Sequence, residues 1–153
     1  MSGLEALGVA ASIIQVADLC TKLSVKLFSL YRKVKNADES LQLLSNEAAL
    51  VGAILRELGD NSKEEEPFKL CSDEAFRTLE HLLDQCRDVL RQIESVISIH
   101  DRSAKSRLRQ VTGKFRLVLL EPNLNPLKMN LERLKSTLLL FLNVIMFAGQ
   151  VRK

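Results

Sequence analysis

The 153-residue chain contains 46% hydrophobic and 27% charged residues, an ordinary soluble composition for one domain. A chain of this length can bury a core without disulfides or a structural metal. The net charge of +3 is too small to predict nucleic-acid binding by itself. Three scattered cysteines form neither a metal-ligand spacing nor a C-x-x-C pair, which favours a reducing, cytosolic compartment. Few glycines, prolines and β-branched runs favour helix over sheet.

The sequence predicts a first helix from Gly3 to about Lys35, opened by a capping box of Ser2 and Glu5. Apolar residues recur along it at steps of three and four, opposite a polar stripe. They are Val9, Ile13, Val16, Cys20, Leu23, Leu27, Tyr31 and Val34. The first half, GLEALGVAASIIQVA, is especially apolar and rich in small residues. It fits either a helix packed between two neighbours in a bundle, or a segment that can leave the bundle and enter a bilayer.

A second helix is predicted from about Asp38 to Leu58, with Gly59 as its end. Its expected inner face consists of Leu41, Leu44, Ala48, Val51 and Leu55. The short joint before it predicts that the first two helices are antiparallel neighbours. Residues 59–72 are interpreted as a solvated loop, because they contain turn formers, an acidic run and a proline. The three consecutive acids lack the spacing of an oxygen cage, so no metal site is expected there.

A third helix is predicted from about Asp73 to Ser98. Its apolar positions are Phe76, Leu79, Leu83, Cys86, Leu90, Ile93 and Ile97. The opposite face carries opposite charges three or four residues apart, which is typical of a solvated helix surface. His81 lies among these polar positions, without a second histidine at ligand spacing, and is interpreted as a surface residue.

A basic connector is expected over about residues 100–114, and a short, interrupted fourth helix from about Lys105 to Leu120, ended by Glu121-Pro122. The basic residues of this region are Arg102, Lys105, Arg107, Arg109, Lys114 and Arg116. They fit either a solvated connection or a contact with an anionic surface such as acidic lipid headgroups. No aromatic residues interleave them, so binding of single-stranded nucleic acid is not expected.

The closing helix is predicted from Leu127 to Gly149, after the helix-start signal Asn125-Pro126. From Leu138 onward it is apolar on all sides except for Asn143. This stretch is too short to span a bilayer, so it predicts a helix buried in the protein core. A buried Asn143 would need hydrogen-bond partners and could fix how the helices align.

These elements together predict an all-α fold, an antiparallel bundle of four to five helices with a long N-terminal helix and a buried C-terminal helix. Residues 1–153 are interpreted as one domain. The sequence contains no phosphate-binding loop, no nucleophile elbow and no H-E-x-x-H motif. We therefore expect no catalytic residues, no metal site and no cofactor, and interpret the chain as not an enzyme.

Two stretches of the chain resemble a known family. The opening LGVAASIIQVADLCTKLSVKLFSLYRKVKNADESLQLLSNEAALVGAIL and the closing LERLKSTLLLFLNVI are similar to fungal N-terminal domains found ahead of NACHT-type nucleotide-switch receptors. These include the HeLo-like domains and the set named after the N-terminus of azaphilone pigment cluster protein L. The resemblance covers about Leu4 to Gly149 and depends on an apolar pattern rather than on catalytic residues.

The resemblance implies a helical effector or signalling domain at the N-terminus of an NLR-like protein. Such domains self-associate on activation and act in programmed cell death or heterokaryon incompatibility, by releasing an apolar N-terminal helix into the membrane. It implies a cytoplasmic protein that is recruited to the plasma membrane, with residues 3–17 as the membrane-active segment. Within that segment, the candidate membrane-contacting residues are Leu4, Leu7, Val9, Ile13 and Ile14.

Several features depart from that pattern. Glu5 lies inside the apolar segment, where a charge is costly in a bilayer. The first helix has only Gly3 and Gly8 as glycines, and these residues include no nucleotide-switch domain. An alternative interpretation therefore stays open: a helical adaptor or oligomerisation module that acts only through protein contacts, for example with a partner helical domain.

Overall fold

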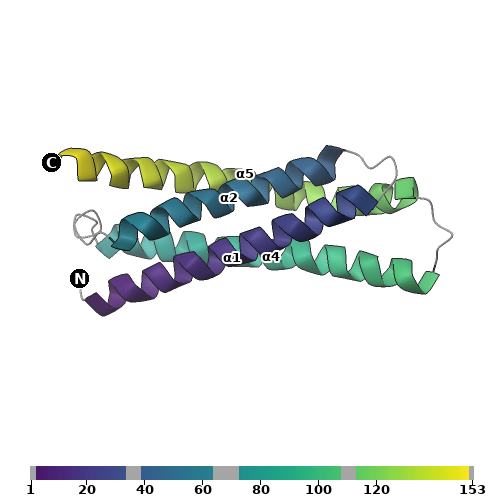
Figure 1. The fold of residues 1–153 in the computed structure, drawn as a ribbon, viewed down its shortest axis with the longest axis horizontal. Helices are drawn as coiled ribbons and strands as arrows, with labels where there is room; N and C mark the ends of the chain where they lie inside the picture. Colours follow the sequence, from purple (N-terminus) through teal and green to yellow (C-terminus); the bar gives the residue numbers. More distant parts are fainter. Residues whose placement is uncertain (1–2, 34–38, 64–72, 108–112, 152–153) are drawn as a thin grey trace.

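The computed structural model describes residues 3–33, 39–63, 73–107 and 113–151, all of them helical. The four described helices are α1 (Gly3–Lys33), α2 (Glu39–Lys63), α4 (Asp73–Arg107) and α5 (Gly113–Val151). They lie along one common direction and form an elongated bundle (Figure 1). The predicted all-α class and helical bundle are confirmed.

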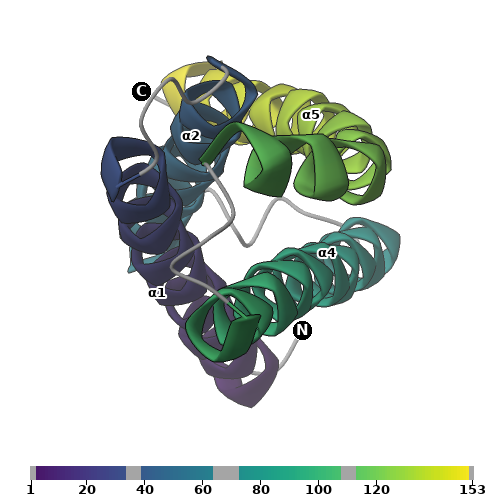
Figure 2. The ribbon, with the colours of Figure 1, turned by 90° about the vertical axis from the view of Figure 1, so that its right-hand side faces the viewer.

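Consecutive helices run in alternating directions along the bundle (Figure 1). Seen along its length, they follow the order α1, α2, α5, α4 around the ring, so each pairs with two neighbours (Figure 2). The neighbours α1 and α2 are antiparallel, as predicted, and so are α4 and α5. The other two neighbouring pairs, α1 with α4 and α2 with α5, run parallel. As a result α2 and α4 lie diagonally opposite, although they follow one another along the chain.

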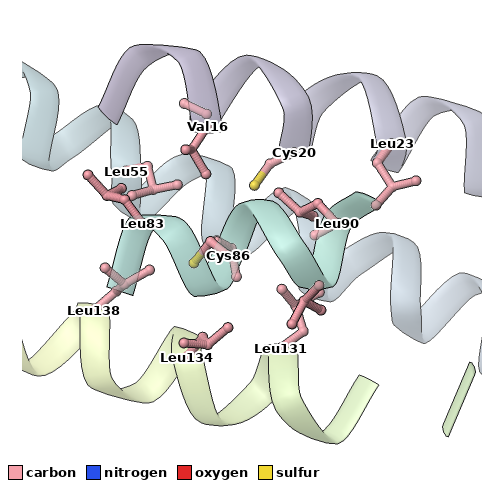
Figure 3. Close-up of a cluster of buried hydrophobic side chains, with 14 of the residues drawn as sticks. Val16, Cys20, Leu23, Leu55, Leu83, Cys86, Leu90, Leu131, Leu134 and Leu138 are labelled. Carbon is pink, nitrogen blue, oxygen red and sulfur yellow. The ribbon is translucent and has the colours of Figure 1, made fainter. Parts of the chain in front are cut away.

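The core is made by the apolar stripes that the sequence predicted. Every residue of the predicted inner faces of α2 and α4 is buried. Leucines of α5 meet them from the other side, with Leu131, Leu134 and Leu138 close to Cys86 and Leu90 of α4 (Figure 3). Val16, Cys20 and Leu23 close the core from α1 (Figure 3). Each helix therefore contributes one face and leaves the other exposed.

Two predicted helix ends are wrong. Helix α2 continues through Gly59 to Lys63, because Gly59 packs against α1: a Cβ added there would lie 3.5 Å from Ile13 Cγ2. Helix α4 continues beyond Ser98 to Arg107, because no glycine or proline interrupts residues 73–107. Residues 59–63 of the predicted loop at 59–72 therefore belong to α2. Residues 100–107 of the predicted basic connector belong to α4.

Helix α5 is also longer than predicted. The sequence signals at Glu121-Pro122 and Asn125-Pro126 predicted two separate helices, but one helix runs from Gly113 to Val151. Leu124 and Leu127 are buried and continue the stripe of Leu131 and Leu134, so packing holds the helix across both prolines. Proline removes a backbone hydrogen bond and bends a helix. The first part of α5, drawn green, is turned against the rest (Figure 2).

Helices α1 and α2 are the most extensively packed pair. A Cβ added to Gly52 of α2 would lie only 3.2 Å from Cys20 Cβ. Nearby, Ser24 Oγ donates to Ser45 O at 3.0 Å and Ser45 Oγ donates to Ser24 O at 2.9 Å. Small residues and paired hydroxyls therefore let the two backbones approach closely.

Candidate functional site

The N-terminal part of α1 contains the residues predicted to contact a membrane. Leu4 and Leu7 lie on α1, but their side chains are outside the described part of the structure. Val9 is 2% exposed and Ile13 fully buried, whereas Ile14 is 47% exposed. In the folded bundle, Val9 and Ile13 are core residues, so they can reach a bilayer only after α1 has left its neighbours.

Helix α1 also contains the one described stretch that is long and apolar enough to cross a membrane, Gly8–Arg32. Length and composition alone support this, and the core helix of a soluble protein passes the same test. The buried residues Val16, Cys20, Leu23 and Leu27 lie in this stretch. The apolar face of α1 is therefore buried in the core of the folded bundle.

Polar contacts hold α1 to both neighbours. The Ser24–Ser45 pair and an Arg56–Thr21 hydrogen bond join it to α2. Towards α4, Lys26 Nζ lies 2.6 Å from Glu94 Oε1, and Arg87 donates to Gln15 at 3.3 Å. These two contacts are exposed, so they contribute little, and burial of the apolar face is the main stabilising term.

Two thiols lie in the same core. Cys20 and Cys86 are free and buried, and face the core from α1 and α4 (Figure 3). Burial raises the pKa of Cys20 to about 12, and the neighbouring Cys86 adds to the increase. Burial alone raises the pKa of Cys86 to about 12. Both thiols are therefore neutral and unreactive at neutral pH, as expected of small core residues.

The C-terminal half of α5 differs from the prediction. Leu138, Leu142 and Ile145 are buried, which confirms a buried face, but the expectation that the helix is covered on all sides is wrong. Large apolar side chains on its other sides are exposed: Leu139 by 44%, Leu140 by 65%, Val144 by 61%, Met146 by 44% and Phe147 by 67%. Asn143 is exposed too, so its predicted role as a buried alignment residue is also wrong.

Helix α2 borders this exposed surface. Lys135 Nζ of α5 lies 2.9 and 2.8 Å from the two carboxylate oxygens of Glu47, in a largely shielded ion pair between the helices. Leu50, one turn after Glu47, is 49% exposed. We call Leu50, Leu139, Leu140, Val144, Met146 and Phe147 the α5 apolar face. Periodicity showed that this end of α5 is apolar all round, but not which sides have neighbours.

The predicted basic cluster cannot be placed in the same way. Arg109 is outside the described residues, and so are the side chains of Arg102, Lys105, Arg107, Lys114 and Arg116. Their contact with anionic lipid stays a prediction.

Most of the described polar residues lie on helix surfaces. His81 is exposed, as predicted, and its Nε2 lies 3.1 Å from Gln85 Nε2 on the same helix. Over the described ranges, no group of three His, Cys, Asp or Glu side chains could hold a metal ion. The two features of the described residues that can support a function are therefore the buried apolar face of α1 and the α5 apolar face.

The fold and these surfaces define a helical-bundle domain with an exposed apolar surface on its last helix. Residues 4–152 match the family described as pigment biosynthesis cluster protein PigL N-terminal, and the chain belongs to this family. No curated protein and no solved structure matches the chain.

Proposed function

We propose that this chain is a non-enzymatic N-terminal effector domain of a fungal NLR-like protein of the NACHT or STAND type. In this proposal the domain rests in the cytoplasm, self-associates on activation and reaches the plasma membrane through α1, in programmed cell death or heterokaryon incompatibility. The family membership supports the domain type, since the same family was expected from the sequence. The observation that carries the membrane step is the nature of α1, a helix long and apolar enough to cross a membrane whose apolar face is buried in the bundle.

Release of α1 needs a source of free energy. Among the described side chains of α1, six large apolar ones are buried, and at about 1.5–3 kcal/mol each their exposure costs roughly 9–18 kcal/mol. They are Val9, Ile13, Val16, Leu23, Leu27 and Leu30. This is comparable with the whole stability of a typical domain, about 5–15 kcal/mol. Transfer of the helix into lipid, or clustering of several copies, must supply it, which explains why such a domain rests until it is activated.

The length of the apolar segment limits how it can enter the membrane. Residues 3–17 form a helix of about 22 Å, shorter than the ~30 Å hydrocarbon core. Asp18, Lys22 and Lys26 follow, and charges are costly in the bilayer centre. We therefore expect α1 to enter one leaflet with its N-terminal half, while acidic lipids meet the basic residues predicted over Arg102–Arg116.

Cys20 provides the test, because its thiol is buried only while α1 is packed. In a Cys71→Ser, Cys86→Ala background, where Cys20 is the one remaining thiol, a soluble maleimide should label Cys20 slowly in buffer and at least about tenfold faster with anionic liposomes, which should also leak dye. The control is Ile14→Glu: Ile14 is 47% exposed, so this variant keeps the core but places a charge in the inserting segment. It should fold and fail to leak. Leakage with Cys20 still protected, or leakage retained by folded Ile14→Glu, would refute the role of α1.

A second candidate function is an adaptor that acts only through protein contacts and ignores lipid. The α5 apolar face favours it, because exposed apolar surface of this extent is typical of interaction sites. It predicts partner binding in the resting fold, with α1 in place, and no effect of liposomes on Cys20 labelling. Nucleic acid is not an expected partner in either case.

A further inference from the structure

We propose that the α5 apolar face is a docking surface for a second copy of this chain. The proposed function includes self-association, and this proposal names the surface through which it occurs. The proposal rests on that part of the proposed function alone. Among the described residues nothing covers this face, which spans α5 and α2 and lies towards the end of the bundle where both chain termini are found (Figure 1).

The spacing of its residues makes the face continuous. Leu140, Val144 and Phe147 follow one another at four and three residues, opposite the buried stripe of α5, so they form one ridge. Leu139 lies one turn after Lys135 and therefore on the side of α5 that faces α2. Because α2 and α5 run parallel and Glu47 pairs with Lys135, Leu50 comes level with Leu139.

The area is large enough for a dimer. The six side chains of the face are 44–67% exposed. Together they present on the order of 500–600 Å² of apolar surface, the upper end of what a monomer exposes and most of the ~800 Å² per partner of a standard interface. Solvated side chains on the rim can supply the remainder.

The charge pattern favours a copy of the same chain over a lipid surface. Residues 136–151 contain no Asp, Glu, Lys or Arg. In a two-fold interface, residues near the axis meet their own copies, so a charge there would repel itself, whereas an uncharged ridge can pack on itself. Glu57 lies two turns beyond Leu50 on the same stripe of α2 and is exposed, and this carboxylate would repel acidic headgroups. The uncharged stretch of α5, about 24 Å long as a helix, is also shorter than the ~30 Å hydrocarbon core of a bilayer.

Sedimentation equilibrium of chain 1–153, from micromolar to millimolar concentration, tests the proposal. We expect a species of twice the 17.2 kDa chain mass. Leu140→Glu and Phe147→Glu should each raise its dissociation constant at least about 100-fold, because a buried, unpaired charge costs several kcal/mol. Both side chains are largely exposed, so circular dichroism should show an intact fold. Val25→Glu is the matched control: Val25 is 65% exposed on α1, outside the face, and its change should leave the dimer intact.

A charge-swap pair separates a second copy from other occupants. Val144→Lys and Val144→Glu should each be monomeric alone and should associate when mixed, since opposite charges then meet across the axis. A wild-type chain that is monomeric throughout would overturn the proposal. So would a dimer insensitive to the face variants, or a monomer whose liposome binding is lost in Leu140→Glu, which would assign the face to lipid. Cys20 labelling is scored separately: a dimer with Cys20 protected on liposomes refutes only the membrane step, and Cys20 exposure without a dimer refutes only the docking face.

Discussion

Two glycines show how the surroundings of one residue decide its effect. Gly8 of α1 has nothing within 4 Å of an added Cβ, whereas a Cβ on Gly52 of α2 would lie 3.2 Å from Cys20 Cβ. Alanine favours a helix over glycine by about 1 kcal/mol in both places. At Gly52 the contacted atom is fixed to the α1 backbone, so the two helices must move apart.

We predict that Gly8→Ala stabilises the chain by about 0.5–1 kcal/mol, and that Gly52→Ala destabilises it by about 1 kcal/mol, because overpacking exceeds the gain in helix propensity. Gly52→Leu should cost more than about 3 kcal/mol. Urea unfolding of the three variants measures this. Equal effects of alanine at the two positions would mean that close approach of α1 and α2 is not what requires Gly52.

The buried thiols predict a loss of stability in alkaline solution. The pKa of Cys20 and of Cys86 is raised from 9.0 to about 12 in the folded chain. Below pH 9 both thiols are protonated in the folded and unfolded states, and the stabilising effect of the neutral thiols is complete. Between pH 9 and 12 these two thiols ionise only in the unfolded chain. Each thiol therefore lowers the free energy of unfolding by up to about 1.4 kcal/mol per pH unit.

Cys86→Ala should therefore show a shallower fall in unfolding free energy over pH 9–12 than the wild type, although its stability at pH 7 is lower because of the cavity. Chemical unfolding at a series of pH values gives both slopes. Identical slopes would show that Cys86 does not titrate in this way.

Helix α5 shows which part of the burial pattern the sequence does not determine. The stripe of Leu127, Leu131, Leu134 and Leu138 was predicted from spacing alone, and each of these residues is buried. The burial of the remaining sides was inferred from their apolar character, and that inference was wrong. Periodicity tells which residues can face a neighbour, but the number of neighbours depends on the arrangement of the whole bundle.

The α2–α5 pairing predicts a difference between removing one charge and removing both. In the Glu47–Lys135 pair, the side chains are only 16% and 25% exposed. Lys135→Leu should cost about 2–4 kcal/mol, because Glu47 is left largely buried and unpaired, and adding Glu47→Leu should recover most of that loss. Thermal unfolding of the two single variants and the double variant completes the cycle. The exposed Lys26–Glu94 pair is the comparison, and Glu94→Gln there should have little effect. Additive effects at Glu47 and Lys135 would contradict a coupled pair.

For the whole molecule, the sequence was sufficient to predict the fold class, the inner faces of the helices and the family. It was insufficient for the helix ends at Gly59 and at the two prolines, because local signals there were overruled by packing against other helices. It also did not predict that α2 and α4 lie diagonally opposite. The α5 apolar face follows from that arrangement, so it could be found only with the ring order known.

The ring order has a consequence for how the chain folds. Each antiparallel pair, α1 with α2 and α4 with α5, is made of consecutive helices, so its contacts are local in sequence and can form early. The two parallel seams, α1 with α4 and α2 with α5, join residues far apart in the chain and can form only when the hairpins dock. Folding is thus expected to divide into rapid formation of two hairpins and a slower docking step. A newly made chain exposes the apolar sides of both hairpins until that step is complete.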